Sequence, residues 1–210
     1  MSAKQSSNKI FMVEPREFYS NPQTEGSNHY QMKSANDEKQ LILDKALIEF
    51  HNFKNNLEKN GVEILSLKGI EGCPDHIFPN WFTTFEDKTM QIFPMNAENR
   101  RKEKTPEMIN KLCEIYKIQN DYGYLELEGI FLESTSSMVF DRVNRIVYAT
   151  PSPRTNENFL NEWCEKNKYD LCSFKTVSHT GSDIYHTDVL MYVGTETVSY
   201  THLRAHETDT

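Results

Sequence analysis

The sequence lacks the features that mark nucleotide-binding, membrane-spanning and secreted proteins. Only 8 of its 210 residues are glycine, and none of them forms the G-x-G-x-x-G loop that cradles a dinucleotide, so nucleotide binding through that motif is unsupported. No apolar run approaches the roughly 20 residues that a membrane-spanning helix needs. The starting stretch, MSAKQSSNKIFMVEP, contains no apolar core of the length found in secretion signals. We therefore expect a cytoplasmic protein with no membrane partner.

Basic clusters and paired cysteines are missing as well. Lys and Arg number 23 against 31 Asp and Glu, which gives a formal net charge of -8. Without a basic block to neutralise phosphates, the chain is a poor nucleic-acid binder. The four cysteines form no C-x-x-C pair, which predicts reduced cytosolic thiols. They are Cys73, Cys113, Cys164 and Cys172.

Strand and helix patterns alternate along the chain, which predicts an α/β fold. An apolar stripe at helical spacing, made of Ala46, Phe50, Phe53 and Leu57, marks a helix that stops at Asn60–Gly61. The order strand, helix, strand recurs about three times. We expect strands at 9–13, 62–67, 89–95, 170–177 and 184–194, a hairpin over 136–150, and helices over 36–59, 107–117 (with Pro106 at its first turn) and 156–167 (capped by Thr155).

One predicted strand begins with polar groups. His186, Thr187 and Asp188 precede the apolar run Val189–Val193. In a strand, residues two apart share a face, so His186 and Asp188 would point into one pocket. Similar polar stretches stand at the ends of other predicted strands, where α/β proteins build their sites. They are 74–85, 93–103, 131–142 with 152–156, and 185–189.

Taken singly, most of these groups have ordinary explanations. His186 alone is more often a satisfied, partly buried histidine than a catalytic one. Asp75 after a proline fits turn chemistry, and a pair such as Arg100 and Arg101 is usually solvated. Glu133 is harder to explain, because a carboxylate within an apolar run needs a partner, for which His186 is a candidate.

Taken together and in order, the segments MVEPREF, PDHIF, NRRKE, LEST, SPRT and YHTD resemble the amidinotransferase and arginine-deiminase-related family of the pentein superfamily. The resemblance covers about Ile10 to Val198. It implies a pentein-type α/β propeller of ββαβ units, which this chain would fill as an incomplete ring of about three units. We expect a disordered start (1–9), a partial pentein domain (10–198), and a non-native tail (199–210).

The resemblance also implies roles for individual residues. Glu133 and His186 match the family's catalytic pair, which assists attack by a cysteine thiolate on the central carbon of a guanidino or ureido group. The other matches would bind substrate. Asp75 and Asn80 would bind its nitrogens, Asp188 would grip a guanidinium, and Arg100 or Arg101, with Arg154, would hold a substrate carboxylate.

Departures from the family pattern leave two questions open. Asp188 favours a charged guanidino substrate whereas Asn80 does not, so both guanidino and ureido substrates remain candidates. Ser134 and Ser136 replace glycines of the family's LEGTGS motif, and a backbone there with positive φ would be strained. No cysteine of this chain matches the family's nucleophile, so we expect the chain to be inactive by itself. The resemblance implies no metal or organic cofactor, because the family's thiolate does the covalent step.

The tail SYTHLRAHETDT carries His202 and His206, four residues apart. It fits a metal-binding helix, a frayed terminus or translated sequencing adapter, and the last fits best.

These observations leave three hypotheses for the function. The first is a fragment of a cysteine hydrolase or amidinotransferase for an arginine- or citrulline-like amino acid, with a homodimer left open. The second is a non-catalytic pentein-fold binding protein of the ribosome-binding type or an inactive relic, and the third is a metal-binding protein using His179, His186, His202 and His206.

Overall fold

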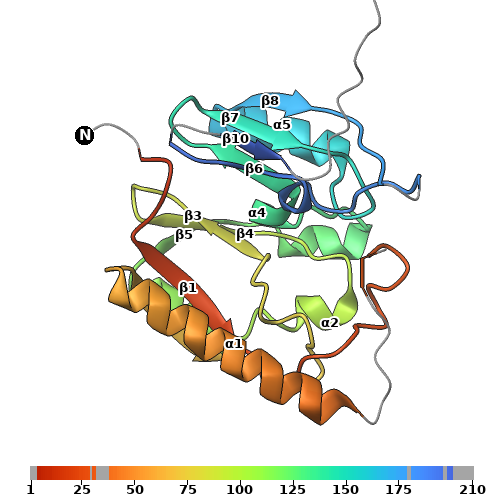
Figure 1. Cartoon of the computed structure of the whole chain (residues 1–210). Helices are drawn as coiled ribbons and strands as arrows, with labels where there is room; N and C mark the ends of the chain where they lie inside the picture. The colour runs from red at the N-terminus through yellow and green to blue at the C-terminus, as the bar shows by residue number, and fades with distance from the viewer. Residues whose placement is uncertain (1–3, 29, 32–37, 179–180, 196–197, 201–210) are drawn as a thin grey trace, which may run out of the picture. The chain divides into compact units, whose positions relative to one another are not determined.

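The computed structural model of the chain describes residues 4–28, 30–31, 38–178, 181–195 and 198–200 (Figure 1). Two compact units make up the chain. The N-terminal unit is Ser7–Ser134, and the C-terminal unit is Thr135–Thr210 together with Met1–Ser6. Within the C-terminal unit, Gln5 accepts a hydrogen bond from the Arg142 amide at 2.8 Å, although it lies in the segment predicted to be disordered.

The N-terminal unit opens with a parallel βαβ segment. Strand β1 (Lys9–Glu14) pairs in parallel with β2 (Glu63–Lys68), and helix α1 (Lys39–Lys59) connects them. Gly61 closes the helix with φ of +81°, as its place after Asn60 predicts. The two predicted strands and the helix are thereby confirmed.

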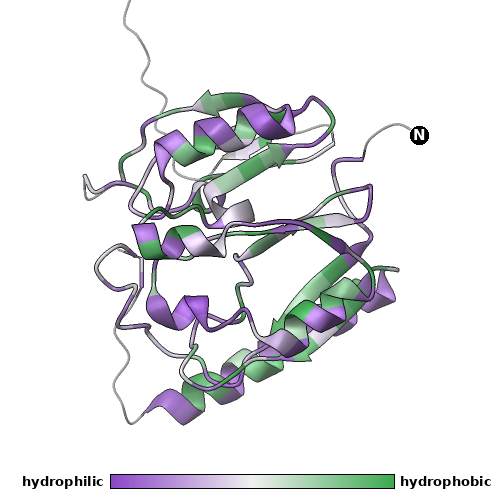
Figure 2. Ribbon diagram, turned by 180° about the vertical axis from the view of Figure 1, so that it is seen from behind, coloured by the Kyte–Doolittle hydropathy of each residue, from purple (hydrophilic) through white to green (hydrophobic). Residues whose placement is uncertain are grey.

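The predicted stripe of α1 is wrong at one position. Ala46 and Phe50 are buried, but Phe53 is 59 % exposed. A sheet of only two strands covers a narrow band of the helix, so an apolar residue beside that band stays in solvent. Figure 2 shows hydrophilic and hydrophobic residues alternating along α1, as an amphipathic helix requires.

A complete ββαβ segment follows. Strands β3 (Phe82–Thr84) and β4 (Thr89–Ile92) are antiparallel, and β4 pairs in parallel with β5 (Lys117–Asp121) after helices α2 (Glu98–Arg101) and α3 (Pro106–Cys113). A 3-10 helix, η2 (Gly123–Glu128), comes next. Sequence patterns missed β3 and β5, which have three and five residues.

Two predicted boundaries in this segment are wrong. The strand expected to reach residue 95 ends at Ile92, because Pro94 cannot donate to a ladder. The helix expected to reach residue 117 ends at Cys113, and Lys117 instead begins β5 beside β4. Pro106 does take the first helical turn, behind the capping hydroxyl of Thr105, which accepts from the Met108 amide at 3.2 Å.

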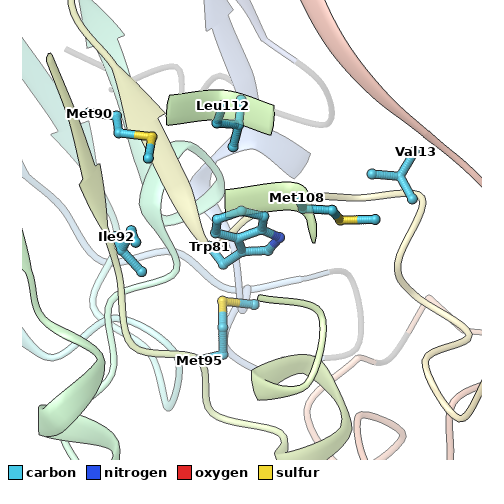
Figure 3. Packing of buried hydrophobic residues seen from close by; sticks show 7 residues of the cluster. All are labelled: Val13, Trp81, Met90, Ile92, Met95, Met108 and Leu112. Atoms are coloured by element: carbon cyan, nitrogen blue, oxygen red, sulfur yellow. The ribbon is translucent and has the colours of Figure 1, made fainter. Parts of the chain in front are cut away.

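The core of the N-terminal unit surrounds Trp81. Figure 3 shows its indole next to Met108 and Met95, with β4 residues on one side. The ring is fully buried, and burial of such a side chain contributes about 2–3 kcal/mol. The cluster consists of Val13, Trp81, Met90, Ile92, Met95, Met108 and Leu112.

The C-terminal unit repeats the ββαβ order. A short helical turn, α4 (Ser134–Ser137), leads from the N-terminal unit into the hairpin of β6 (Met138–Asp141) and β7 (Ile146–Ala149). Helix α5 (Glu157–Asn167) then leads to β8 (Asp170–Ser173), which is parallel to β7. The predicted hairpin is confirmed. The N-cap of α5 is Asn156 and not Thr155, since the Oδ1 of Asn156 accepts a hydrogen bond from the Phe159 amide at 2.9 Å. Strand β8 stops at residue 173, whereas the sequence predicted residue 177.

The last described elements begin another hairpin. A 3-10 helix, η3 (Thr187–Val189), precedes β9 (Met191–Val193), which pairs antiparallel with β10 (Val198–Tyr200). The chain thus reads βαβ, ββαβ, ββαβ, ββ. This order accounts for the threefold recurrence of strand, helix and strand seen in the sequence.

Candidate active site

The candidate residues fall into two groups. Asp75, Asn80, Arg100, Arg101 and Glu133 belong to the N-terminal unit. Arg154, His186 and Asp188 belong to the C-terminal unit. The predicted pair of Glu133 with His186 joins residues of different units and stays a prediction.

Arg100 forms a buried ion pair with a residue that sequence reasoning passed over, Glu103. The Arg100 Nε lies 2.9 Å from Glu103 Oε1 and its Nη2 lies 3.1 Å from Oε2, with exposed fractions of 3 % and 0 % for the two side chains. Nη2 also donates to the carbonyls of Asp75 and Phe78. The guanidinium of Arg100 therefore fixes the loop that carries Asp75.

Burial shifts the pKa values of Arg100 and Glu103 in opposite directions, because it disfavours the charged form of each side chain. Burial by itself lowers the pKa of Arg100, but the attraction and hydrogen bonds of Glu103 outweigh it and raise that pKa. Burial raises the pKa of Glu103 to about 7, against the opposing effect of Arg100. Both side chains depend on each other to remain ionised inside the unit.

Arg101 and Glu133 hold the same short segment of backbone. The Asn96 amide donates to Glu133 Oε1 at 3.0 Å, and Glu133 is completely buried. Arg101 donates from Nε to the Met95 carbonyl at 3.0 Å and from Nη2 to the Asn96 carbonyl at 2.8 Å. The Met95 amide in turn donates to Glu126 at 2.8 Å. Two carboxylates and one guanidinium thus clamp Met95–Asn96, and Glu133 is oriented by that clamp.

Asp75 presents one carboxylate oxygen to protein donors. Its Oδ2 accepts from Asn21 Nδ2 at 2.7 Å and from Thr24 Oγ1 at 3.4 Å. Asn80 lies half-buried in the same loop, and its side-chain amide has no hydrogen-bond partner among the described residues. Both residues therefore offer polar atoms to a ligand that donates or accepts hydrogen bonds.

The buried thiols are poor nucleophiles. Cys73 donates from Sγ to the Asn99 carbonyl at 3.0 Å, and burial, followed by Glu103 and Glu17, raises its pKa to about 11. Burial raises the pKa of Cys164 to about 12. A thiolate is the reactive form, so neither residue has the microenvironment of an activated cysteine. Cys113 and Cys172 are exposed.

In the C-terminal unit, Arg154 and His186 gather around Tyr185. The Arg154 guanidinium lies 4.5 Å from the Tyr185 ring centre, and the His186 ring lies 4.8 Å from it. Their exposed fractions are 3 % and 4 %. Ser152 Oγ holds the Tyr185 carbonyl at 2.8 Å. The structure therefore brings these two predicted residues together.

The expectation that His186 and Asp188 share one face is wrong. Residues 187–189 form η3, and the strand begins only at Met191. Side chains two apart in a 3-10 helix point in different directions, because that helix has about 3 residues per turn. His186 is buried whereas Asp188 is exposed.

Thr187 explains why the chain turns there. Its Oγ1 donates to the Ser137 carbonyl at 2.7 Å and accepts from the Thr150 amide at 3.0 Å. Thr155 Oγ1 donates to Ser137 Oγ at 2.8 Å in the same buried cluster. These hydroxyls fix His186 on the loops that carry Arg154. The polar start of the apolar run was the only signal for Thr187 in the sequence.

Ser134 adopts the conformation that the family's glycine would suit. Its φ is +44°, its side chain is fully buried, and its Oγ has no hydrogen-bond partner among the described residues. A left-handed φ costs a non-glycine residue about 1–2 kcal/mol, and a buried unpaired hydroxyl adds to that. The strain predicted for this position is confirmed, whereas Ser136 does not have a positive φ.

We expect Ser134→Gly to stabilise the chain by about 1–2 kcal/mol, because it relieves the backbone and removes the unpaired hydroxyl. Urea denaturation monitored by circular dichroism measures the change. Ser136→Gly is the matched control, since Ser136 is equally buried but has no positive φ, and it should not stabilise. Equal gains from both substitutions would contradict this explanation.

The described residues include no cluster of three or more His, Cys, Asp or Glu side chains placed to hold a metal ion. Of the four histidines in the metal hypothesis, His186 is described, while His179, His202 and His206 lie outside the described residues. No described helix has both the length and the apolar character needed to cross a membrane.

Solved structures share this fold. The N-terminal domain of ArgZ, an arginine dihydrolase of cyanobacteria crystallised as a cysteine-to-serine mutant with its substrate, has a TM-score of 0.67 at 16% identity, covering 91% of this chain and 66% of that one. Another crystal of that domain, covalently bound to a reaction intermediate, matches equally well and is covered to 65%. DDAH from Pseudomonas aeruginosa, a cysteine-to-serine mutant with citrulline, has a TM-score of 0.58 at 17% identity, covering 88% and 65%. The chain thus spans about two thirds of the length of these structures.

At the level of sequence, one protein family matches this chain. No curated protein matches the chain. The sequence model of the family described as N,N dimethylarginine dimethylhydrolase, eukaryotic, matches residues 14–201. That range includes all the candidate catalytic and substrate-binding residues and confirms the resemblance to the pentein, arginine-deiminase-related proteins. The chain belongs to the eukaryotic N,N-dimethylarginine dimethylhydrolase family.

Proposed function

We propose that this chain supplies the substrate-binding and acid–base groups of a cysteine-dependent enzyme acting on the guanidino or ureido group of an arginine- or citrulline-like amino acid. The observation that carries the proposal is Glu133, a fully buried carboxylate held by the Asn96 amide within the family's motif. Burying a carboxylate costs free energy, so a fully buried carboxylate at this position fits a catalytic role.

The roles follow from the chemistry of the reaction. A thiolate attacks the central carbon and displaces one nitrogen, to which His186 gives a proton. His186 then activates water, or another acceptor, to release the covalent intermediate. Glu133, the other member of the family's catalytic pair, would assist His186 in these proton transfers. Whether the acceptor is water or an amine decides between a hydrolase and an amidinotransferase.

The remaining residues bind substrate in this proposal. Asp75 and Asn80 face its nitrogens, with Asp188 as a further carboxylate, and Arg154 takes the α-carboxylate. Arg100 or Arg101 would also hold the substrate carboxylate, through donors other than the Nε and Nη2 atoms that already bond to Glu103 and to protein carbonyls.

The nucleophile is not among the four cysteines of this chain. Two are buried with raised pKa values, and the other two lie outside the family's motifs. The ββαβ segments would be units of a pentein-type ring, of which this chain holds about three. A cytoplasmic location and the non-native character of 199–210 remain part of the proposal.

We expect the purified chain to bind L-arginine or L-citrulline in isothermal titration calorimetry and to turn over neither. Arg154→Ala should weaken L-arginine binding at least tenfold, because a charge-assisted contact to the α-carboxylate is lost, and should leave agmatine, which lacks that carboxylate, within twofold. Arg145→Ala is the matched control: Arg145 is an exposed arginine that stacks on Tyr169 at 3.8 Å in the same unit.

Equal losses for L-arginine and agmatine would contradict the role of Arg154. Absence of binding to both amino acids would contradict the proposed function and favour the non-catalytic binding protein. Turnover by the chain itself would place the nucleophile among its own cysteines.

A further inference from the structure

An amide network that the proposed reaction does not use surrounds Asp75. Asn21 donates from Nδ2 to Asp75 Oδ2 at 2.7 Å, and its Oδ1 accepts from Asn99 Nδ2 at 2.8 Å and from the Gln23 amide at 3.0 Å. The Asn99 amide donates to Gln23 Oε1 at 2.8 Å. The network links three stretches that are distant in sequence: the loop after β1, the loop of Asp75, and α2.

These groups are deeply buried. Asn21 is 0 % exposed, Thr24 2 % and Asn99 7 %. Gln31 closes the loop after β1 by donating to the Asn21 carbonyl at 2.9 Å. A buried amide whose donor and acceptor are both satisfied has one allowed orientation, because turning it would leave buried polar atoms unpaired. Asn21 therefore holds its Nδ2 toward Asp75 in a fixed direction.

The contact leaves one carboxylate oxygen available. Asn21 and Thr24 both reach Oδ2 of Asp75, and Oδ1 has no partner among the described residues. Asp75 is only partly buried, so a ligand has access to it. A carboxylate anchored through one oxygen presents the other in a single geometry, as bidentate or directed recognition of an N–H donor requires.

We infer that Asn21 is a positioning residue that orients the carboxylate of Asp75 for the N–H groups of a guanidino or ureido ligand. This inference rests on the proposed function for its ligand. The loop after β1 thereby belongs to the binding machinery, although its residues lie outside the polar strand ends that the sequence singles out.

Asn21→Asp is the first test: it keeps the acceptor for Asn99 and Gln23, removes the Nδ2 donor to Asp75 Oδ2 and to Asn99 Oδ1, and places a second carboxylate beside Asp75. We expect it to weaken L-arginine binding about tenfold, the loss typical of one charge-assisted hydrogen bond. In a chain that already carries Asp75→Ala, the same substitution should change binding less than twofold, because Asn21 acts through Asp75. Asn28→Asp adds the same charge to the same loop without contacting Asp75 and should change binding less than twofold in both backgrounds.

A purely structural role predicts a different result, namely equal losses from Asn21→Asp with and without Asp75, and that outcome would overturn the inference. If Asn21→Asp does not fold, Asn21→Ala in the same cycle decides the question.

A second measurement needs neither ligand nor an Asn21 variant. In protein labelled with ¹⁵N-asparagine, the Asn21 side-chain N–H directed at Asp75 should be protected from hydrogen exchange and lose that protection in Asp75→Ala, while the Asn21 N–H directed at Asn99 Oδ1 and the Asn28 signal stay unchanged. Protection that survives Asp75→Ala would overturn the inference. If the wild-type chain binds no L-arginine or L-citrulline, the proposed function fails, and the exchange measurement still decides whether Asn21 orients Asp75.

Discussion

Glu103→Gln is expected to lower the free energy of unfolding by about 3–5 kcal/mol, the largest effect anticipated for a single substitution in the N-terminal unit. The variant removes the ion-pair partner and largest counter-charge of the buried Arg100 guanidinium, and breaking a buried pair on one side is far more costly than the pair itself. The loop of Asp75 and Phe78 depends on the same guanidinium, so ligand binding should weaken together with stability.

Each unit contains one of the two tryptophans, which allows their stabilities to be read separately. Trp81 reports the N-terminal unit in a Trp163→Phe background. Urea unfolding at pH 8, above the pKa of about 7 of Glu103, compares variants with that pair ionised. Glu114→Gln is the control, because Glu114 also pairs with a cation three residues away, Lys111 at 2.7 Å, but in solvent. It should cost less than about 1 kcal/mol. A cost for Glu103→Gln no greater than for the control would show that the buried pair contributes nothing.

Thr187→Val is expected to destabilise the C-terminal unit by about 2–5 kcal/mol. Valine has the same shape, so packing is preserved while one hydroxyl disappears. The Thr150 amide and the Ser137 carbonyl both lose this hydroxyl in a region closed to water, and a lost hydrogen bond to a buried polar group costs about 1–3 kcal/mol. The η3 turn that carries His186 should loosen as a result.

Trp163 fluorescence in a Trp81→Phe background measures this change. Thr176→Val is the control: its hydroxyl lies 2.9 Å from that of Thr150, but Thr176 is only half-buried, so water replaces the lost contact. We expect less than about 1 kcal/mol for it. If Thr187→Val is no worse than Thr176→Val, the hydroxyl bridge does not hold the turn.

Local sequence patterns predicted much of the fold, because helix stripes, helix ends and hairpin turns depend on residues that lie close together in the chain. The stripe of α1 with Gly61 behind it, the hairpin of β6 and β7, and the Pro106 start of α3 are each specified within a few residues. Short strands such as β3 escaped detection, because three residues carry no period. Their existence depends on a neighbour that supplies the ladder.

The candidate site divides in the same way. The order of its motifs identified the family, and the loss of glycine at Ser134 predicted the strained backbone found there. Sequence spacing failed at His186 and Asp188, because the Thr187 hydroxyl bonds to Ser137 and Thr150, which are 50 and 37 residues away, and bends the chain into η3 instead of a strand.

By itself, the sequence determined the family, the order of strands and helices, and the set of charged side chains that the site can use, since these follow from residue identity and short-range spacing. Only the tertiary structure decided which of these polar side chains bond to other groups of the protein. Asn21 and Asp75 lie 54 residues apart and meet only on folding, whereas Arg100 with Glu103 and Arg101 with the Met95–Asn96 carbonyls are near neighbours in the chain. The physical reason is that burial removes water as a partner, so each polar group takes the donor or acceptor that the packed chain places nearest to it.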